Sequence, residues 1–208
     1  IVDYPLHALI GLKQDYLHYG DLSTSLMFKD RILQQLALYE SIQDENGFLA
    51  AAPPTTGFIP GWSRKMGPDD FGIAAYGQMM LYQNFKIAAY FARLWKEHSL
   101  ARHYERKAGQ LGKNIITYFW DNERKAFING YRTDGSKDDR ISHHAQYWGV
   151  LTGLYPEENY PYLFDKVIPS IPFYKENISY EKGYECLAYI KAGRIKEMFA
   201  PVSYTHLR

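Results

Sequence analysis

The stretch from residue 61 to residue 72 holds the densest group of side chains that could bind a ligand or exchange a proton. Trp62 and Arg64 lie near its start, and the adjacent carboxylates Asp69 and Asp70 lie near its end. The stretch leads from a Pro/Gly-rich loop into a long apolar run, and loops at helix ends often carry binding residues. The alternative is an ordinary helix start, in which Asp69 or Asp70 caps the helix after a turn. Both interpretations remain open from the residues alone.

Two further places combine titratable side chains with a helical pattern. His143 and His144 are adjacent, so on a helix they point about 100° apart and one of them could face a cavity. A structural, hydrogen-bonded histidine is the alternative. Glu185 lies in the first part of a later helical run, where it could reach a cavity or make a structural hydrogen bond. The spacing of histidines, carboxylates and the single cysteine, Cys186, predicts no zinc site, and we expect no cofactor.

Composition narrows the class of protein. The chain has 208 residues, 46% of them hydrophobic, and a net charge of +1, which gives no reason to expect nucleic acid or a membrane surface as partner. No apolar run is long enough for a transmembrane helix. Aromatic residues make up 16% of the chain. Tyrosine and tryptophan suit a polar-lined sugar site, and they equally suit a large helical core.

Apolar periodicity predicts a mainly helical chain. The expected helices cover residues 4–19, 22–42, 70–97, 99–120, 141–153, 157–167, 180–192 and 194–200. The first two should form an antiparallel αα-hairpin, since Gly20 and Asp21 end one helix and begin the next. Run 70–97 is apolar nearly all round, whereas 99–120 has one apolar stripe. A turn with short extended arms is expected over 120–131, a loop containing Pro169 and Pro172 after residue 167, and no longer strand.

Alternation of buried and one-faced helices predicts the architecture. We expect an all-α fold, a partial (α/α)6 toroid with about four αα-hairpins. Residues 1–200 should form a single domain, truncated at both ends, so the chain is expected to be an internal fragment of a longer protein. Residues 201–208 follow a break in the helical period, resemble translated sequencing-adaptor sequence, and are expected to be a non-native tail.

An ordered set of short motifs resembles the bacterial α-L-rhamnosidase family. The matching stretches are Val2-Asp3-Tyr4 with Tyr19-Gly20-Asp21, Gln43-Asp44-Glu45-Asn46-Gly47-Phe48-Leu49 followed by Gly61-Trp62, Phe119-Trp120-Asp121-Asn122-Glu123, Ile141-Ser142-His143-His144-Ala145, and Tyr184-Glu185-Cys186-Leu187 with Ala192-Gly193. They resemble the family's "IDY…Y-x-GD", "D-x-DGLL…GDW", "FWDEE", "VSQHAN" and "LLEAL…AG" motifs. The resemblance covers residues 1–199 and implies a six-hairpin glycosidase barrel.

The family's implied activity is hydrolysis of terminal α-L-rhamnosides with inversion, by two carboxylates about 6.5–9.5 Å apart. The family's general acid lies in a "D-x-x-R-x-E-R-x-G-W" motif and its base in a "T-x-W-E" motif, and this chain contains neither. The resemblance therefore leaves the catalytic carboxylates unassigned, with Glu185 as a weak candidate, and predicts that the chain alone is inactive.

The resemblance also suggests a sugar-binding wall. Trp62 matches the region of the family's pocket tryptophan and is expected to stack on the sugar. The family's "GDW" reads Pro60-Gly61-Trp62 here, so its aspartate has no counterpart. Arg64, Asp69, Asp70 and His144 are the other expected substrate-binding residues.

Two other functions remain open from the sequence. One is a non-catalytic helical module that binds carbohydrate. The other is a different six-hairpin glycosidase, such as a trehalase-like or glucoamylase-like hydrolase. In each case the expected partner is a carbohydrate, and sequence flanking this chain would distinguish the three.

Overall fold

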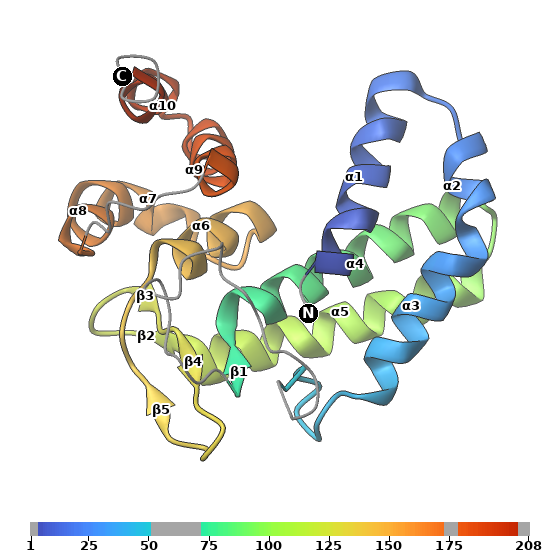
Figure 1. Cartoon of the computed structure of the whole chain (residues 1–208), viewed down its shortest axis with the longest axis horizontal. Helices are drawn as coiled ribbons and strands as arrows, with labels where there is room; N and C mark the ends of the chain where they lie inside the picture. The colour runs from blue at the N-terminus through green and yellow to red at the C-terminus, as the bar shows by residue number, and fades with distance from the viewer. Residues whose placement is uncertain (1–3, 51–71, 173–178, 204–208) are drawn as a thin grey trace. The chain divides into compact units, whose positions relative to one another are not determined.

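A computed structural model describes residues 4–50, 72–172 and 179–203 (Figure 1). These residues divide into two compact units. Of the described residues, the first unit contains 4–50 and 77–118, and the second contains 72–76, 119–172 and 179–203. Trp62, Arg64, Asp69 and Asp70 lie outside the described residues.

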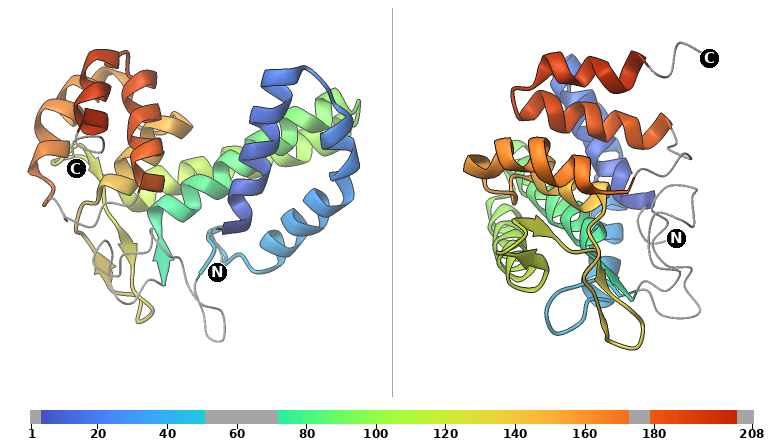
Figure 2. Two further views of the ribbon diagram at one scale, coloured as in Figure 1. Left: turned by 45° about the horizontal axis from the view of Figure 1, so that its top comes forward. Right: turned by 90° about the vertical axis from the view of Figure 1, so that its left-hand side faces the viewer.

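The first unit begins with an antiparallel helical hairpin. Helix α1 spans Tyr4–Tyr19, α2 spans Ser23–Met27 and α3 spans Lys29–Ser41. Figures 1 and 2 show α2 and α3 returning along α1, which confirms the predicted hairpin. The prediction of one helix over 22–42 was wrong, because Phe28 leaves helical geometry with φ −96° and ψ 3°. Gly20 adopts φ 68°, and Asp21 Oδ1 accepts the Ser23 N–H at 2.9 Å, so the connection has the predicted chemistry.

A second antiparallel helix pair completes this unit. Helix α4 spans Ala75–Leu94 and α5 spans His98–Phe119. Most of α4 is buried, as its apolar sequence predicts. Helix α5 buries one stripe and exposes the rest, also as predicted; its buried apolar side chains are Ala101, Tyr104, Ala108, Leu111, Ile115 and Phe119. The Glu40 carboxylate on α3 lies 3.0 Å from His103 Nε2 and forms an ion pair with Lys107 Nζ at 3.3 Å. These contacts link α3 to α5.

The second unit contains small antiparallel sheets beside its helices. Strands β1 (Ile73–Ala74), β4 (Gly130–Tyr131) and β5 (Lys137–Asp138) form one sheet in the order β1-β4-β5. Strands β2 (Trp120–Asp121) and β3 (Ala126–Phe127) form another. The extended arms predicted over 120–131 are confirmed. Strands β1 and β5 were not predicted, because two residues are too few to show a period.

Gly130 shows why β4 can approach β1 so closely. Its φ is 149°, and a Cβ there would lie 2.0 Å from the Ile73 carbonyl oxygen. Ile73 pairs with Tyr131, and Ala74 pairs with Gly130. A side chain at this position would therefore collide with the neighbouring strand.

Helix α6 (His143–Thr152) begins at an N-cap, where Ser142 Oγ accepts the Ala145 N–H, and ends at Gly153, which has φ 77°. The next run consists of a 3₁₀ turn (Glu157–Asn159), α7 (Tyr160–Tyr162), a π-helical turn (Leu163–Val167) and α8 (Ile168–Ser170). Pro161 lies in the first turn of α7, so it is accommodated there. The run continues through Pro169, so the loop predicted to follow residue 167 begins later.

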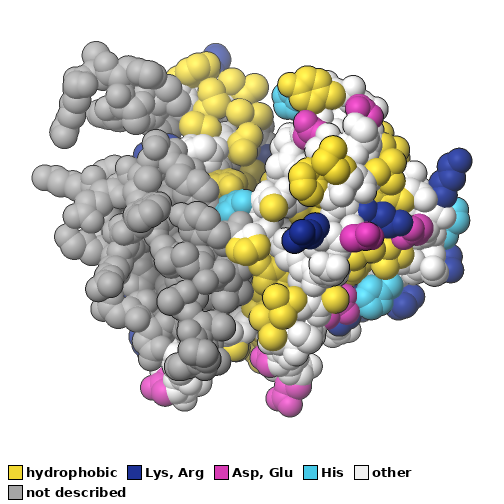
Figure 3. Space-filling model, turned by 45° about the vertical axis from the view of Figure 1, so that its right-hand side comes forward, with side chains coloured by type: hydrophobic (Ala, Val, Ile, Leu, Met, Phe, Trp, Pro, Cys, Tyr) yellow, Lys and Arg dark blue, Asp and Glu magenta, His cyan; other side chains and the backbone are white. Residues whose placement is uncertain are grey.

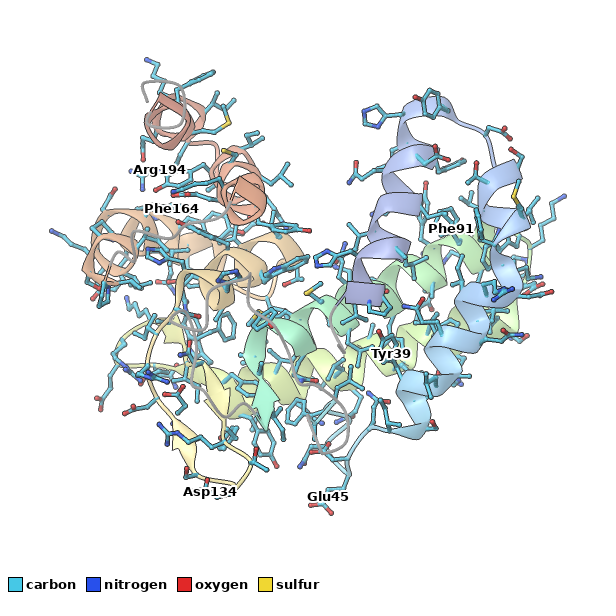
Figure 4. All side chains as sticks on the ribbon, viewed as in Figure 1. Tyr39, Glu45, Phe91, Asp134, Phe164 and Arg194 are labelled. Atoms are coloured by element: carbon cyan, nitrogen blue, oxygen red, sulfur yellow. The ribbon has the colours of Figure 1, made fainter. Side chains whose placement is uncertain are left out.

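Helices α9 (Ser179–Lys191) and α10 (Ile195–Ser203) close the described chain and pack against each other (Figure 2). Helix α9 also packs against α6. Arg194, labelled in Figure 4 beside Phe164, lies 5.5 Å from the centre of that ring and pairs with Asp165 at 2.5 Å. The helical backbone of α10 extends through Ser203 into the predicted tail.

The chain is mostly helical, which confirms the predicted fold class. Within the described ranges, no helix is both long and apolar enough to cross a membrane. Large apolar side chains nevertheless reach the surface, and Figure 3 shows them beside charged ones on one face; the most exposed include Tyr19, Met27, Leu38 and Phe199.

Candidate functional site

Of the predicted site residues, His144 and Glu185 lie within the described chain. Both belong to the second unit, His144 near the start of α6 and Glu185 in the second turn of α9. The packing of α6 against α9 brings their polar side chains together. We call the group formed by His143, Tyr147, Lys182 and Glu185 the α6–α9 polar cluster.

Glu185 is the centre of this cluster. One carboxylate oxygen, Oε1, accepts a hydrogen bond from the Tyr147 hydroxyl at 3.1 Å. The other, Oε2, accepts one from Lys182 Nζ at 2.5 Å. The Glu185 side chain is 13% exposed and the Lys182 side chain 21%, so this charge pair is partly shielded from water. The carboxylate is therefore held in place by donors from two helices, and its remaining lone pairs can accept further donors.

Tyr147 is kept protonated by its surroundings. Burial, with the Glu185 carboxylate as a second cause, raises its pKa well above the ordinary value. The hydroxyl therefore remains a hydrogen-bond donor at any pH near neutrality. The His143 ring lies 5.9 Å from the Tyr147 ring, and burial lowers the pKa of His143, although Glu185 acts in the opposite direction. A neutral His143 offers one donor and one acceptor.

His144 points into a different environment from His143, as expected for adjacent helical residues. Its side chain is buried at 7% exposure, and its ring lies 5.7 Å from that of Tyr76. Burial, followed by the neighbouring His143, lowers the pKa of His144 to about 4. The ring is consequently neutral at physiological pH. Its expected contact with substrate stays a prediction.

Aromatic rings lie next to the cluster on the same helices. Trp148 on α6 and Tyr184 on α9 have ring centres 4.8 Å apart and planes inclined by 40°. Neighbouring donors, acceptors and aromatic faces are the groups that recognise a sugar, through its hydroxyls and its apolar face. Across the described residues, no three His, Cys, Asp or Glu side chains come together to hold a metal ion.

The sequence pointed to His143, His144 and Glu185 but not to Tyr147 or Lys182 as members of a site. The signal that could have found Lys182 is its spacing from Glu185, since residues three apart on a helix lie on one face. Tyr147 follows His143 by four residues on α6 and shares its face for the same reason. Neither spacing predicts that α6 packs against α9, which brings these residues together.

Comparison with known proteins gives a match to a family model and matches to several solved structures, two of which are described here. A family model described as trehalase matches residues 78–190. No curated protein sequence matches the chain. The crystal structure of a GH78 family rhamnosidase from Bacillus sp. GL1 is similar with a TM-score of 0.84 and 20% identity over 97% of this chain. A rhamnosidase from Klebsiella oxytoca with rhamnose bound is similar with a TM-score of 0.81 and 19% identity over 98% of it.

The structural matches confirm the fold and show how much of each matched protein the chain covers. The chain spans 21% of the length of the Bacillus protein and 37% of the Klebsiella protein. At such low identity the likeness establishes the fold alone: a mostly helical chain that corresponds to part of a six-hairpin glycosidase domain. The predicted relation to the rhamnosidase fold is confirmed on that basis.

Proposed function

The chain belongs to the trehalase family of six-hairpin glycosidases, and we propose that it is part of a glycoside hydrolase that releases terminal α-L-rhamnose with inversion. The observation that carries this proposal is the structural likeness over nearly the whole chain to two rhamnosidases, one of them with rhamnose bound. The ordered rhamnosidase-like motifs over residues 1–199 support the same substrate. The match to the family model supports the class of enzyme.

In this proposal the chain supplies binding groups, and the acid and base come from the flanking sequence. Inversion needs one carboxyl group that protonates the leaving oxygen and a second that activates water on the opposite face of the ring. Glu185 already accepts hydrogen bonds from Tyr147 and Lys182. It therefore serves as a fixed acceptor for a sugar hydroxyl rather than as the acid, which must carry a proton to donate.

The residues expected from the sequence complete the proposed wall. Trp62 stacks on the face of the rhamnose ring, and Arg64, Asp69 and Asp70 contact its hydroxyls. His144 is proposed as a further contact through its neutral ring. The α6–α9 polar cluster adds an acceptor in the Tyr147 hydroxyl oxygen, whose hydrogen is donated to Glu185, and a charged pair in Lys182 and Glu185.

The test uses the full-length protein that contains this chain. The protein is incubated separately with p-nitrophenyl α-L-rhamnopyranoside and with α,α-trehalose. Proton NMR identifies the released sugar and the anomer in which it is first released, before mutarotation. The proposal predicts rhamnose released with inverted configuration, and a large loss of turnover on Trp62→Ala. Release of rhamnose with retained anomeric configuration would contradict the mechanism. Release of neither rhamnose nor glucose would contradict both substrate assignments.

Hydrolysis of trehalose is the second candidate, since the matching family model is described as trehalase. That model covers residues 78–190, which include α6 and most of α9. Glucose release without rhamnose release in the same assay would favour this candidate. If the full-length protein binds rhamnose but hydrolyses neither substrate, the remaining hypothesis is a non-catalytic carbohydrate-binding module.

A further inference from the structure

The chain contains two Asn-Gly pairs, Asn46–Gly47 and Asn129–Gly130. In such a pair the glycine nitrogen can attack the asparagine side-chain carbon Cγ, because glycine has no side chain to hinder the approach. The N–Cγ bond that forms closes a five-membered succinimide, and the Cγ–Nδ2 bond breaks and releases ammonia. Water then adds to either carbonyl of the ring and leaves aspartate or isoaspartate. The reaction, a deamidation, needs water but no oxidant or reductant.

The two pairs lie in different surroundings. Asn46 and Gly47 are half-buried and follow the exposed Glu45 in the turn after α3, and Figure 4 shows Glu45 projecting from this turn. Asn129 is only 6% exposed, and Gly130 belongs to strand β4. Water and hydroxide can therefore reach the first pair more readily than the second.

Four hydrogen bonds hold Asn46 and Gly47 in the folded chain. The Asn46 N–H donates to Asp44 Oδ1, and the Gly47 N–H donates to the Asp44 carbonyl oxygen, both at 2.9 Å. The Asn46 carbonyl oxygen accepts from Asn114 Nδ2 at 2.7 Å. The side-chain oxygen Oδ1 of Asn46 accepts from the Tyr118 hydroxyl at 2.9 Å. Because Asn114 and Tyr118 belong to α5, the turn is tied to a helix distant in the sequence.

We propose that Asn46 is a latent deamidation site, which the folded chain suppresses by tying this turn to α5. Ring closure requires the Gly47 nitrogen to lose its proton and the Asn46 side chain to rotate toward that nitrogen. The hydrogen bond from Gly47 to Asp44 opposes the first step, and the bond from Tyr118 opposes the second. Opening of the turn releases both restraints. This site is independent of the proposed glycosidase function.

The modification would alter a connection that leads into the interior of the first unit. Leu49, three residues after Asn46, exchanges two hydrogen bonds with Gln78 of α4, at 2.8 and 2.9 Å. Isoaspartate lengthens the backbone at residue 46 by one methylene group. Either product also adds a carboxylate beside Glu45 and near Asp44, and like charges repel. Both products should therefore loosen the turn.

The test measures modification by peptide mapping with mass spectrometry, which separates the asparagine, aspartate and isoaspartate forms at residues 46 and 129. The full-length protein is incubated in mildly alkaline buffer, both folded and unfolded in guanidinium chloride. Unfolding releases all four hydrogen bonds, so we expect residue 46 to react faster there by a factor on the order of ten or more. Residue 129 should stay unmodified in the folded protein. Equal rates at residue 46 in the two states, or no reaction in the unfolded chain, would overturn the proposal.

Tyr118→Phe locates the restraint. The variant removes the hydroxyl and keeps the ring, whose centre lies 5.4 Å from that of Phe48. One hydrogen bond corresponds to about a fivefold change in an equilibrium, so we expect residue 46 of the folded variant to react about five times faster than in wild type. Tyr19→Phe, at a 78% exposed position at the end of α1, is the matched control and should leave the rate unchanged. An unchanged or slower rate in folded Tyr118→Phe, or an equal acceleration at residue 129, would refute the restraint.

Discussion

Leu49 in the first unit and Phe127 in the second are held by glutamines at the same position of two different helices. Gln78 is the fourth residue of α4, and Gln146 is the fourth residue of α6. The Leu49 N–H donates to Gln78 Oε1 at 2.8 Å, and Gln78 Nε2 donates to the Leu49 carbonyl at 2.9 Å. Phe127 makes the same pair of bonds with Gln146, at 2.9 and 2.7 Å. We call each arrangement an amide clamp.

The backbone geometry explains why a glutamine is needed at both places. Leu49 is paired with Gln43, and Phe127 with Trp120, in short antiparallel ladders. The ladder bonds beside them are Asp44 N–H to Phe48 O and Ile128 N–H to Phe119 O, both 2.9 Å. In such a ladder the intervening residue directs its own N–H and C=O away from the partner strand. The glutamine amide satisfies these buried groups as another strand would.

The two clamps differ in what surrounds them. Leu49 belongs to a single bridge, whereas Phe127 belongs to a two-residue ladder and packs against Trp120 and Tyr155 at ring distances of 5.0 and 6.1 Å. A Cβ on Gly149 would lie 2.8 Å from the Phe127 ring, so the second clamp has no spare room. The clamped residues precede their glutamines by 29 and 19 positions. Each clamp thus fixes the residue at which the connection to the following helix begins, whereas the length of that connection differs between the two units. Connections that vary in length are where binding specificity is usually found.

Removing either clamp should produce the largest effect. Gln146→Leu and Gln78→Leu each leave a buried N–H and a buried C=O without a partner, at about 1–3 kcal/mol per group, so we expect each to lower the free energy of unfolding by about 3–4 kcal/mol. Urea unfolding measures this loss. Gln34→Leu, at an exposed position of α3, is the matched control and should change stability little. If either clamp variant behaves like this control, the two clamps are not equivalent.

Lowering the pH should destabilise the second unit through His144, which lies on the same helix as the second clamp's Gln146. The second residue of α6 is His144, whereas the second residue of α4 is Tyr76. The folded pKa of His144 is about 4, below its unfolded value of 6.5, so only the unfolded chain takes up this proton between those pH values. Stability should therefore fall by up to about 3 kcal/mol as the pH falls from 6.5 to 4.

This pH effect is measured as the difference between wild type and His144→Phe. The variant should lose the part of the acid slope that His144 contributes, and hydrogen exchange of Phe127 should be less sensitive to acid in the variant. Parallel pH profiles for the two proteins would show that burial of His144 does not oppose its protonation.

The sequence predicted those elements whose side-chain period is long enough to read. Helix α1 and the contrast between buried α4 and one-faced α5 follow from apolar spacing over several turns. Strands of two residues show no period. A single polar residue such as Gln78 in an apolar helix gives no indication of the backbone group it binds. For the candidate site, residue type alone suggested Glu185, but its partner Tyr147 comes from another helix and depends on tertiary packing.

Each clamp lies beside a turn in which an aspartate side chain, Asp44 or Asp121, accepts backbone N–H groups. Substituting these aspartates should lower stability less than removing a clamp, and by different amounts in the two units. Asp44 Oδ1 accepts the N–H groups of Asn46 and Phe48 at 2.9 and 2.7 Å. Asp121 accepts those of Glu123 and Arg124, and also pairs with Arg124 Nε at 2.8 Å. We expect Asp→Ala at either position to cost about 1–2 kcal/mol.

Asparagine distinguishes the two turns. Asp44→Asn keeps a side-chain oxygen that can accept both N–H groups and should restore most of the stability, whereas Asp121→Asn also loses its charge-assisted bond to Arg124 and should restore less. Thermal unfolding of the four variants provides the comparison. Equal rescue at both positions would show that the Asp121–Arg124 ion pair contributes nothing measurable.

The central claim is that the second unit carries sugar-binding groups at the α6–α9 polar cluster. Its most direct test is steady-state hydrolysis of p-nitrophenyl α-L-rhamnopyranoside by the full-length protein and its Glu185→Gln and Tyr147→Phe variants. Glu197→Gln, which removes an exposed carboxylate of α10 that pairs with Arg194, is the control. We predict that Glu185→Gln lowers kcat/KM at least tenfold, that Tyr147→Phe lowers it less, and that the control leaves it unchanged, all with native circular dichroism. Unaltered kcat/KM in a folded Glu185→Gln protein would contradict the account.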